Sequence, residues 1–316
     1  MAMGLGRKHG AKPARDGFHS GGSSGALMRP VLGALLASGL LLASAPALAQ
    51  GRCDREGLQA VAEAYVDAQQ TANPFKMKMG LWVTYNEQLE LGTMSTGLLS
   101  KPLKIDFHRN LLDTTACKTF SEIVVADPAN PYVIGSVVSV GGLGGPDEVS
   151  TVDVIYTDKV NGWLFSPANT LKYSKAENWS EIPAAERDSR ATIIAAANAY
   201  LDLFNDKNVK VPWGTPCERL EGGLYTSKAA PGATLPDDSC AVGVPSGVKI
   251  TDRAYVVDET LGAVAVLSRF GGNASPDVHT FRVEHGKLRY VHTITACKVS
   301  NCGLKLSADI QARLAN

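Results

Sequence analysis

The chain has 316 residues, and its 31 basic and 31 acidic side chains give a formal net charge of zero. No basic stripe interrupts this balance, which argues against a nucleic acid as partner. The motif H-E-x-x-H and the P-loop are also missing from the sequence, so several large hydrolase and nucleotide-binding classes are excluded.

The first segment, residues 1–49, has the features of an export signal. A basic, Gly/Ser-rich run precedes Met28, which we take as the true start, and Arg29 then supplies the positive charge of a signal peptide. A short apolar run from Val31 to Leu42 and the small residues at 47–49 complete the pattern. We therefore expect a periplasmic or secreted protein. No later run reaches the ~18 apolar residues of a spanning helix, so we expect no membrane anchor.

All six cysteines follow the expected cleavage point, and an even number in an exported chain predicts disulfides. Many pairings are possible. Short loops favour Cys297 with Cys302 and Cys217 with Cys240, which leaves Cys53 for Cys117. A zinc site is the alternative, but no pair has the C-x2-C spacing, and we predict no metal.

The remainder of the chain repeats one plan twice. Apolar residues recur at helical spacing over 58–68 and again over 193–204. Tyr65 and Tyr200 align at an offset of 135 residues, and Glu87 and Glu221 align at an offset of 134. Offsets this similar predict an internal duplication.

Each helical segment is followed by β-rich runs. These are residues 120–125 and 132–140 in the first half, and 253–257 and 262–270 in the second. Each half is predicted to close with a hairpin, the first turning at Asn161-Gly162 between 152–160 and 163–166, the second at His285-Gly286. Helices followed by a curved antiparallel sheet predict an α+β cone. The expected order is a first domain over 50–175, a polar linker over 176–188, a second domain over 189–303 and a tail over 304–316.

The second hairpin, Pro276 to Cys297, carries two histidines. A two-residue turn at His285-Gly286 predicts that His279 lies opposite His292. Period-2 alternation then places Phe281 and Tyr290 on the same, mostly apolar face. This face has the composition expected of a pocket floor. The alternative interpretation is two packed histidines bonded to backbone or water.

Three motifs of the second half, with this hairpin, carry a family resemblance. They are VPWGTPCERLEGGLY at 211–225, VPSG at 244–247 and YVVDE at 255–259. From about Cys53 to Gly303 the chain resembles a family of secreted proteins, abundant in fungi, of largely unassigned function. The resemblance implies a nuclear transport factor 2-like (SnoaL-like) cone, in which helices close a bent sheet over a hydrophobic cavity. That wider superfamily includes cofactor-free isomerases, dehydratases, cyclases and the γ-formaldehyde lyases that sphingomonads use on lignin-derived dimers.

Comparison of the two predicted hairpins assigns the chemistry to the second half. Counted outward from the turns, His279 and His292 correspond to Ile155 and Ala168, so only the second half has the histidines. Glu221 is the matching carboxylate, whose pKa would rise beside an apolar cavity. Its alternative role is to cap a loop or to pair with Arg219.

The residues expected to contact substrate are drawn from both halves. They are Arg219, Phe281 and Tyr290 in the second half, and Tyr85, Glu87, His108 and Arg109 in the first.

The function predicted from these residues is that of an exported, cofactor-independent lyase or isomerase. Its substrate would be a small hydrophobic, aromatic molecule of the lignin-derived type, with possible release of formaldehyde, and its catalytic groups would be His279, His292 and Glu221. The alternative is a non-catalytic binding or cell-surface protein for an apolar ligand. The sequence leaves the oligomeric state open.

Overall fold

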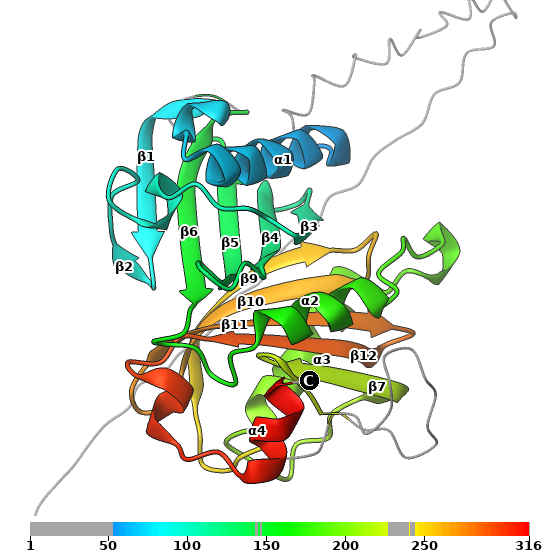
Figure 1. The fold of residues 1–316 in the computed structure, drawn as a ribbon. Coiled ribbons are helices and arrows are strands. Elements are labelled where there is room, and N and C mark those ends of the chain that lie inside the picture. The colour runs from blue at the N-terminus through cyan, green and yellow to red at the C-terminus, as the bar shows by residue number, and fades with distance from the viewer. Residues whose placement is uncertain (1–52, 143–144, 146, 227–239, 241–243, 316) are drawn as a thin grey trace, which may run out of the picture. The chain divides into compact units, whose positions relative to one another are not determined.

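The computed structural model describes residues 53–142, 145, 147–226, 240 and 244–315. The predicted signal peptide and its cleavage site lie outside these residues. The described chain is an α+β protein with two six-stranded mixed sheets, as Figure 1 shows. The α+β class predicted from the sequence is therefore confirmed.

The first sheet has the strand order β2-β1-β6-β5-β4-β3. Strands β3 to β6 are antiparallel neighbours, whereas β1 runs parallel to β6. Helix α1 begins after Asp54, whose carboxylate accepts a hydrogen bond from the Gly57 N–H and caps the helix. The elements are α1 (Arg55–Thr71), β1 (Met79–Glu87), β2 (Glu90–Leu91), β3 (Phe107–Asp113), β4 (Lys118–Val125), β5 (Tyr132–Val140) and β6 (Val149–Thr157), with short 3-10 helices at Pro74–Lys76 and Leu98–Ser100.

The second sheet repeats this order as β8-β7-β12-β11-β10-β9, again with a parallel pair, β7 and β12. Its helix α3 is capped by Ser189, which accepts a hydrogen bond from the Thr192 N–H. The elements are α3 (Arg190–Leu203), β7 (Trp213–Glu221), β8 (Leu224–Tyr225), β9 (Ile250–Asp258), β10 (Ala263–Phe270), β11 (Ser275–Glu284) and β12 (Lys287–Thr295), with α2 (Pro167–Ala176) between the halves, α4 (Ala308–Ala315) at the end and 3-10 helices at Ala184–Glu186 and Ser300–Gly303.

The repeated topology agrees with the duplication predicted from the sequence. Strands β1 and β7 have the same length, and both of their bounds differ by the predicted 134 residues. Tyr65 and Tyr200 both lie fully buried on their helices. Glu87 and Glu221 end equivalent strands.

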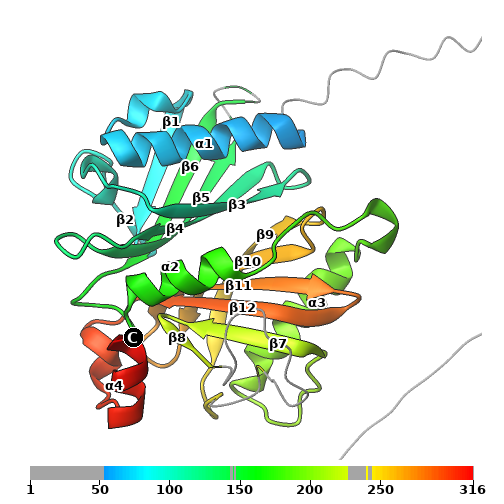
Figure 2. The same cartoon turned by 45° about the vertical axis from the view of Figure 1, so that its right-hand side comes forward.

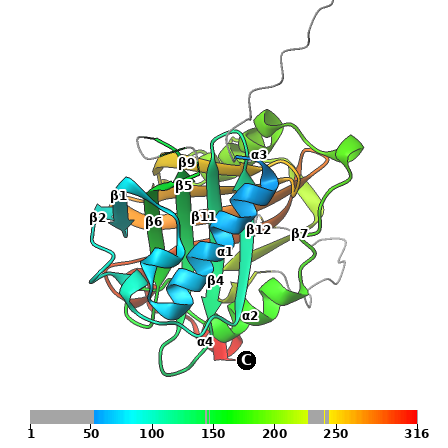
Figure 3. The same cartoon turned by 90° about the horizontal axis from the view of Figure 1, so that it is seen from above.

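Each sheet has two buried faces, which we call the helix-covered face and the inter-sheet face. Helix α1 crosses the first sheet and α3 packs on the second, each over its own apolar cluster (Figures 2 and 3). A third cluster joins the two sheets and includes Phe120 and Ile155 from the first with Ala265 and Val278 from the second. Successive residues of a strand therefore point into different cores.

The first predicted hairpin is wrong. Strand β6 pairs with β5 through the glycine-rich segment 141–148, not with residues 163–166, which contain no strand. Gly141 and Gly142 have φ values of 96° and 94°, and glycine adopts these without steric cost. Asn161-Gly162 instead forms a turn after β6, in which Asp158 N–H donates to the Asn161 side chain. An Asn-Gly signal marks a turn but does not specify which strand pairs next.

Reciprocal ion pairs join the two halves. Arg190 donates to both oxygens of Asp113 at 2.7 and 2.8 Å, and Arg55 donates to both oxygens of Asp258 at 2.7 and 2.9 Å. Each aspartate also accepts a backbone N–H from the opposite half, at 2.9 and 3.0 Å respectively. Both aspartates are fully buried, so these bonds compensate for the loss of hydration.

Three disulfides connect Cys53 to Cys117, Cys217 to Cys240 and Cys297 to Cys302, as predicted. They indicate an oxidising compartment. Among the described residues, no helix is long and apolar enough to cross a membrane.

Candidate active site

The two histidines of the second hairpin lie on opposite faces of the sheet, so their predicted pairing is wrong. The turn is where the sequence places it, since Glu284 pairs with Lys287. Beyond Val283, however, Arg282 pairs with Tyr290, so Arg289 is an extra residue that forms a β-bulge. The bulge shifts the register by one residue.

After the bulge, His279 pairs with Thr293 and His292 pairs with Thr280. A shift of one residue moves a side chain to the other face. His279 therefore contacts the aromatic side chains under α3, whereas His292 faces the first sheet.

His279 belongs to a buried His–Asp pair on the helix-covered face. Its Nδ1 lies 2.6 Å from Oδ2 of Asp277, and both residues are fully buried. The ring lies 5.7 Å from Tyr200, 6.0 Å from Phe204 and 5.9 Å from Phe281, measured between centroids. Nε2 has no hydrogen-bond partner among the residues that the structure describes.

Asp277 is itself held in place by two hydroxyl groups. Thr295 donates to its Oδ1 at 2.6 Å, and Ser268 donates to its Oδ2 at 3.0 Å. An ionised carboxylate only accepts hydrogen bonds, so the proton of the short contact is on Nδ1 of His279. This tautomer leaves the Nε2 lone pair available as a base.

Polar residues of three neighbouring strands continue from His279 in one row. His279 on β11 pairs with Thr293 on β12, which pairs with Glu221 on β7. Paired residues on adjacent strands have their side chains about 5 Å apart. The Thr293 hydroxyl is buried and, within the described part of the chain, accepts or donates no hydrogen bond.

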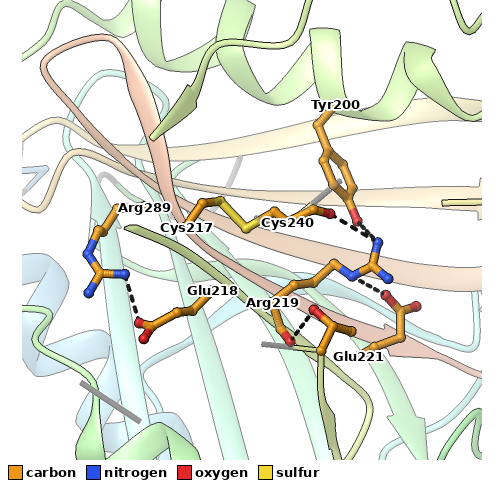
Figure 4. The surroundings of a disulfide bond; sticks show 8 residues. Tyr200, Cys217, Glu218, Arg219, Glu221, Cys240 and Arg289 are labelled. Carbon is orange, nitrogen blue, oxygen red and sulfur yellow. Dashed lines mark hydrogen bonds and ion pairs between the residues drawn. A yellow bond between two sulfur atoms is a disulfide. The ribbon is translucent and has the colours of Figure 1, made fainter. Parts of the chain in front are cut away.

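Arg219 completes the polar part of this face (Figure 4). Its Nε is 3.2 Å from Oε2 of Glu221, and its Nη1 donates to the Tyr200 hydroxyl at 3.3 Å. Trp163 Nε1 donates to the other oxygen of Glu221 at 3.2 Å. Burial alone would lower the pKa of Arg219, but its interactions with Tyr200 and Glu221 raise it instead, so the guanidinium remains charged. Burial also raises the pKa of Tyr200 and keeps it a neutral donor.

His292 belongs to a different group, the inter-sheet ion network of Arg109, Glu122, Glu177 and His292. Its Nδ1 lies 2.7 Å from Glu122 Oε1, and its Nε2 lies 2.6 Å from Glu177 Oε2. Burial alone would lower the pKa of His292, but these two carboxylates outweigh it and raise the pKa to about 9. Because both nitrogens donate to carboxylates, this imidazolium is not available as a base.

The other members of the network are also paired. Burial would raise the pKa of Glu122, but the charges of His292 and Arg109 lower it to about 2. Arg109 donates to Glu122 Oε2 at 3.1 Å and lies 4.0 Å from the centroid of the Trp179 ring. Glu177 and Trp179 come from the segment predicted as a linker between the halves. That segment therefore supplies buried residues to the contact between the sheets.

The remaining predicted site residues lie in separate places. Tyr290 stacks on Trp179 at 5.6 Å on the inter-sheet face. Tyr85 donates to Glu87 at 2.6 Å, and Glu87 also accepts the Leu98 N–H at 2.6 Å, so this carboxylate binds loop backbone. His108 lies on the surface beside Glu63, at 3.3 Å. Of the predicted set, only His279, Phe281, Arg219 and Glu221 share the helix-covered face of the second sheet.

The sequence interpretation missed Asp277, Tyr200 and Thr293 as members of this group. Asp277 is two residues before His279 on one strand, a spacing that puts both side chains on one face. This signal was available in the sequence. Thr293 was not predictable, because only the bulge brings it next to His279.

Within the described residues, the first half has no histidine at the position equivalent to His279 or to His292. Glu87 pairs with Val154, which pairs with Ser136, so register places Ser136 at the position of His279. By the same register, His292 corresponds to Asp153. Ser136 and Asp153, rather than the predicted Ile155 and Ala168, are therefore the equivalents of His279 and His292. Only the second half has histidines at these two positions, as predicted.

The fold and the site together define a duplicated α+β protein with a buried His–Asp pair in its second half. The family model described as a domain of unknown function, DUF8021, matches residues 186–295. This segment contains Asp277, His279, Arg219 and Glu221, but it excludes Glu122 and Glu177. No curated protein and no solved structure matches the chain.

No group of three or more His, Cys, Asp or Glu side chains within the described residues has the arrangement of a metal site. The candidate site consists of the side chains of Asp277, His279, Thr293, Tyr200, Arg219 and Glu221. These offer one base, one fixed cation and hydroxyl donors.

Proposed function

We propose that the protein is a cofactor-independent lyase or isomerase whose active site is the helix-covered face of the second sheet. The observation that carries the proposal is the hydrogen bonding of the two ring nitrogens of His279. One ring nitrogen is bonded to Asp277 at 2.6 Å, and the other is buried without a partner in the described chain. A base oriented in this way is suited to proton abstraction.

The roles of the neighbouring residues follow from their contacts. Asp277 stabilises the imidazolium that forms when His279 takes a proton. Arg219, Tyr200 and Thr293 are the groups that can stabilise negative charge developing on the substrate. Glu221 positions Arg219 through the 3.2 Å ion pair. His292, in contrast, has a structural role in this proposal.

The substrate class proposed is a small hydrophobic, aromatic molecule of the lignin-derived dimer type. The aromatic rings of Tyr200, Phe204 and Phe281 around His279 support it, because they provide apolar surface beside the base. For each half we propose the nuclear transport factor 2-like fold, in which helices close a bent sheet over a hydrophobic cavity.

The reaction proposed removes formaldehyde from a dimer whose primary and secondary alcohol carbons are both bonded to one central carbon, as in a 1,3-diol. His279 takes the proton of the primary hydroxyl, and the carbon–carbon bond to that carbinol carbon breaks to release formaldehyde. The electron pair of this bond forms the new carbon–carbon double bond as the secondary hydroxyl leaves and, with the proton, departs as water. The products are a conjugated alkene, formaldehyde and water.

The test is incubation of the purified protein with a panel of lignin-type dimers, followed by assays for formaldehyde and for the ultraviolet absorbance of the alkene. Both signals should rise together for at least one dimer. Full burial of His279 also favours a second candidate, a non-catalytic protein that encloses an apolar ligand. Quenching of tryptophan fluorescence by a dimer without product would support this second candidate instead.

A further inference from the structure

Exposed apolar side chains lie on or beside β1 and β2, the outer strands of the first sheet. Phe75, Leu81, Trp82 and Leu91 have exposed fractions of 86%, 80%, 79% and 82%, the largest among the large apolar side chains that the structure describes as exposed. Leu81 and Trp82 follow each other on β1 and therefore lie on its two faces. We call these four residues the β1 edge patch, and large apolar groups at this level of exposure mark a candidate interaction surface.

The backbone at this edge also lacks a neighbouring strand over part of β1 in the described chain. Strand β2 pairs only with Asn86 and Glu87, so in the described chain no strand covers residues 80–84 on that side. Pairing with β6 is interrupted between Met79 and Thr84 as well. An exposed, apolar strand edge favours the addition of another strand.

The second half shows that this exposure is not a general feature of the fold. At the offset of 134 residues, Leu81 and Trp82 correspond to Thr215 and Pro216 on β7. Proline has no N–H to donate and therefore blocks pairing at a strand edge. The next residue, Cys217, is bonded to Cys240. The equivalent edge thus has no large exposed apolar side chain and one fewer donor.

The charges around the patch favour a protein partner over an anionic lipid surface. Lys76 is paired with Asp67 at 3.0 Å, and Lys78 is paired with Asp147 at 2.8 Å. The rim is therefore of mixed sign, as in protein interfaces.

We propose that the β1 edge patch is a self-association surface, at which β1 strands of two copies pair antiparallel about a two-fold axis. A two-fold interface uses the same patch on both copies, and an antiparallel edge is self-complementary. Aromatic side chains bury ~150–250 Å² each, so the patch offers on the order of 600 Å² per copy. Two copies then reach the roughly 1,200 Å² at which specific interfaces begin.

Sedimentation velocity of the purified protein tests this, at concentrations from about 1 to about 100 μM. The wild type should dimerise within this range. Trp82→Lys and Leu81→Glu, made separately, should each raise the dissociation constant of the dimer at least tenfold and so shift the protein toward monomer. Leu304→Lys is the matched control, because Leu304 is also exposed, at 61%, but lies beyond β12, and this variant should remain dimeric.

A monomeric wild type across the whole range would overturn the proposal, as would a Trp82→Lys variant that dimerises like the wild type while retaining the wild-type thermal melt. Vesicles of neutral phosphatidylcholine provide a further arm. Sedimentation of a monomeric wild type with these vesicles, abolished by Trp82→Lys, would also overturn it by assigning the patch to a lipid surface.

Discussion

Asp277 and His279 lie two residues apart on β11, and the 2.6 Å contact between them is supported by hydroxyl groups from two other strands. Three strands of the second sheet therefore fix one imidazole. In the first sheet the equivalent of His279 is Ser136, and the equivalent of Asp277 is Ile134, an apolar residue. The two halves share a topology but differ at the residues able to move a proton.

The inter-sheet ion network predicts a large loss of stability on removal of one charge. Glu122→Gln keeps the size of the side chain but leaves Arg109 and His292 buried with one carboxylate fewer. Breaking such a buried pair costs about 3–5 kcal/mol in the free energy of unfolding. Urea unfolding at neutral pH measures it.

Glu63→Gln is the matched control for this prediction, because Glu63 pairs with a histidine at the surface, where its side chain is 47% exposed. Its cost should stay within about 0.5 kcal/mol. Equal costs for the two variants would show that the network does not stabilise the fold.

The same network predicts how stability changes with pH. The pKa of His292 rises from 6.5 to about 9 on folding, so its contribution is complete below pH 6.5 and is lost as the pH rises through 9. The pKa of Glu122 falls from 4.5 to about 2, so its contribution is complete above pH 4.5 and is lost as the pH falls toward 2. The contribution of the network is therefore largest between pH 4.5 and 6.5.

The measurement is the difference in the free energy of unfolding between wild type and His292→Gln, followed from pH 4.5 to about pH 9. The difference should be largest at pH 4.5–6.5 and shrink on the alkaline side as His292 loses its proton in the folded protein. A difference that grows between pH 6.5 and 9 would contradict the assignment of His292 as a buried cation.

The reciprocal ion pairs of Asp113 and Asp258 predict that removing either carboxylate lowers the free energy of unfolding by the same amount. Asp113→Ala and Asp258→Ala each remove an arginine contact to both carboxylate oxygens and leave three backbone N–H groups without their acceptor. Each should cost about 3–5 kcal/mol, because an arginine and three backbone donors lose a buried partner. Thermal or urea unfolding tests both variants.

Asp202→Ala is the control, since this carboxylate pairs with Arg253 but is 52% exposed. It should cost about 1 kcal/mol or less. If Asp113→Ala and Asp258→Ala differ by more than the cost of this control, the two contacts are not energetically equivalent.

The sequence predicted the elements that depend on local patterns. Helical spacing located α1 and α3, and the offset of 134 residues aligned Glu87 with Glu221, the last residues of β1 and β7, although neither strand was predicted. It could not predict that β1 runs parallel to β6, because that pairing joins segments about sixty residues apart by contacts that leave no local pattern.

The site was predicted only in part, and the bulge at Arg289 is the reason. A two-residue turn at His285-Gly286 fixes the register only up to the first irregularity. One extra residue moved His292 and Tyr290 to the inter-sheet face and brought Thr293 beside His279. Asp277, in contrast, was identifiable from its spacing to His279.

The most direct test of the proposed function is turnover of the best dimer substrate by His279→Ala and Asp277→Asn, with His108→Ala as a surface control. Both site variants break a fully buried pair, so we expect them to lower the thermal melt while they remain folded at the assay temperature. Both should lose about 10²–10⁴-fold in kcat, the range for a general base. His108→Ala should match the wild type. Wild-type turnover by a folded His279→Ala variant would contradict the account, because it would place the base elsewhere.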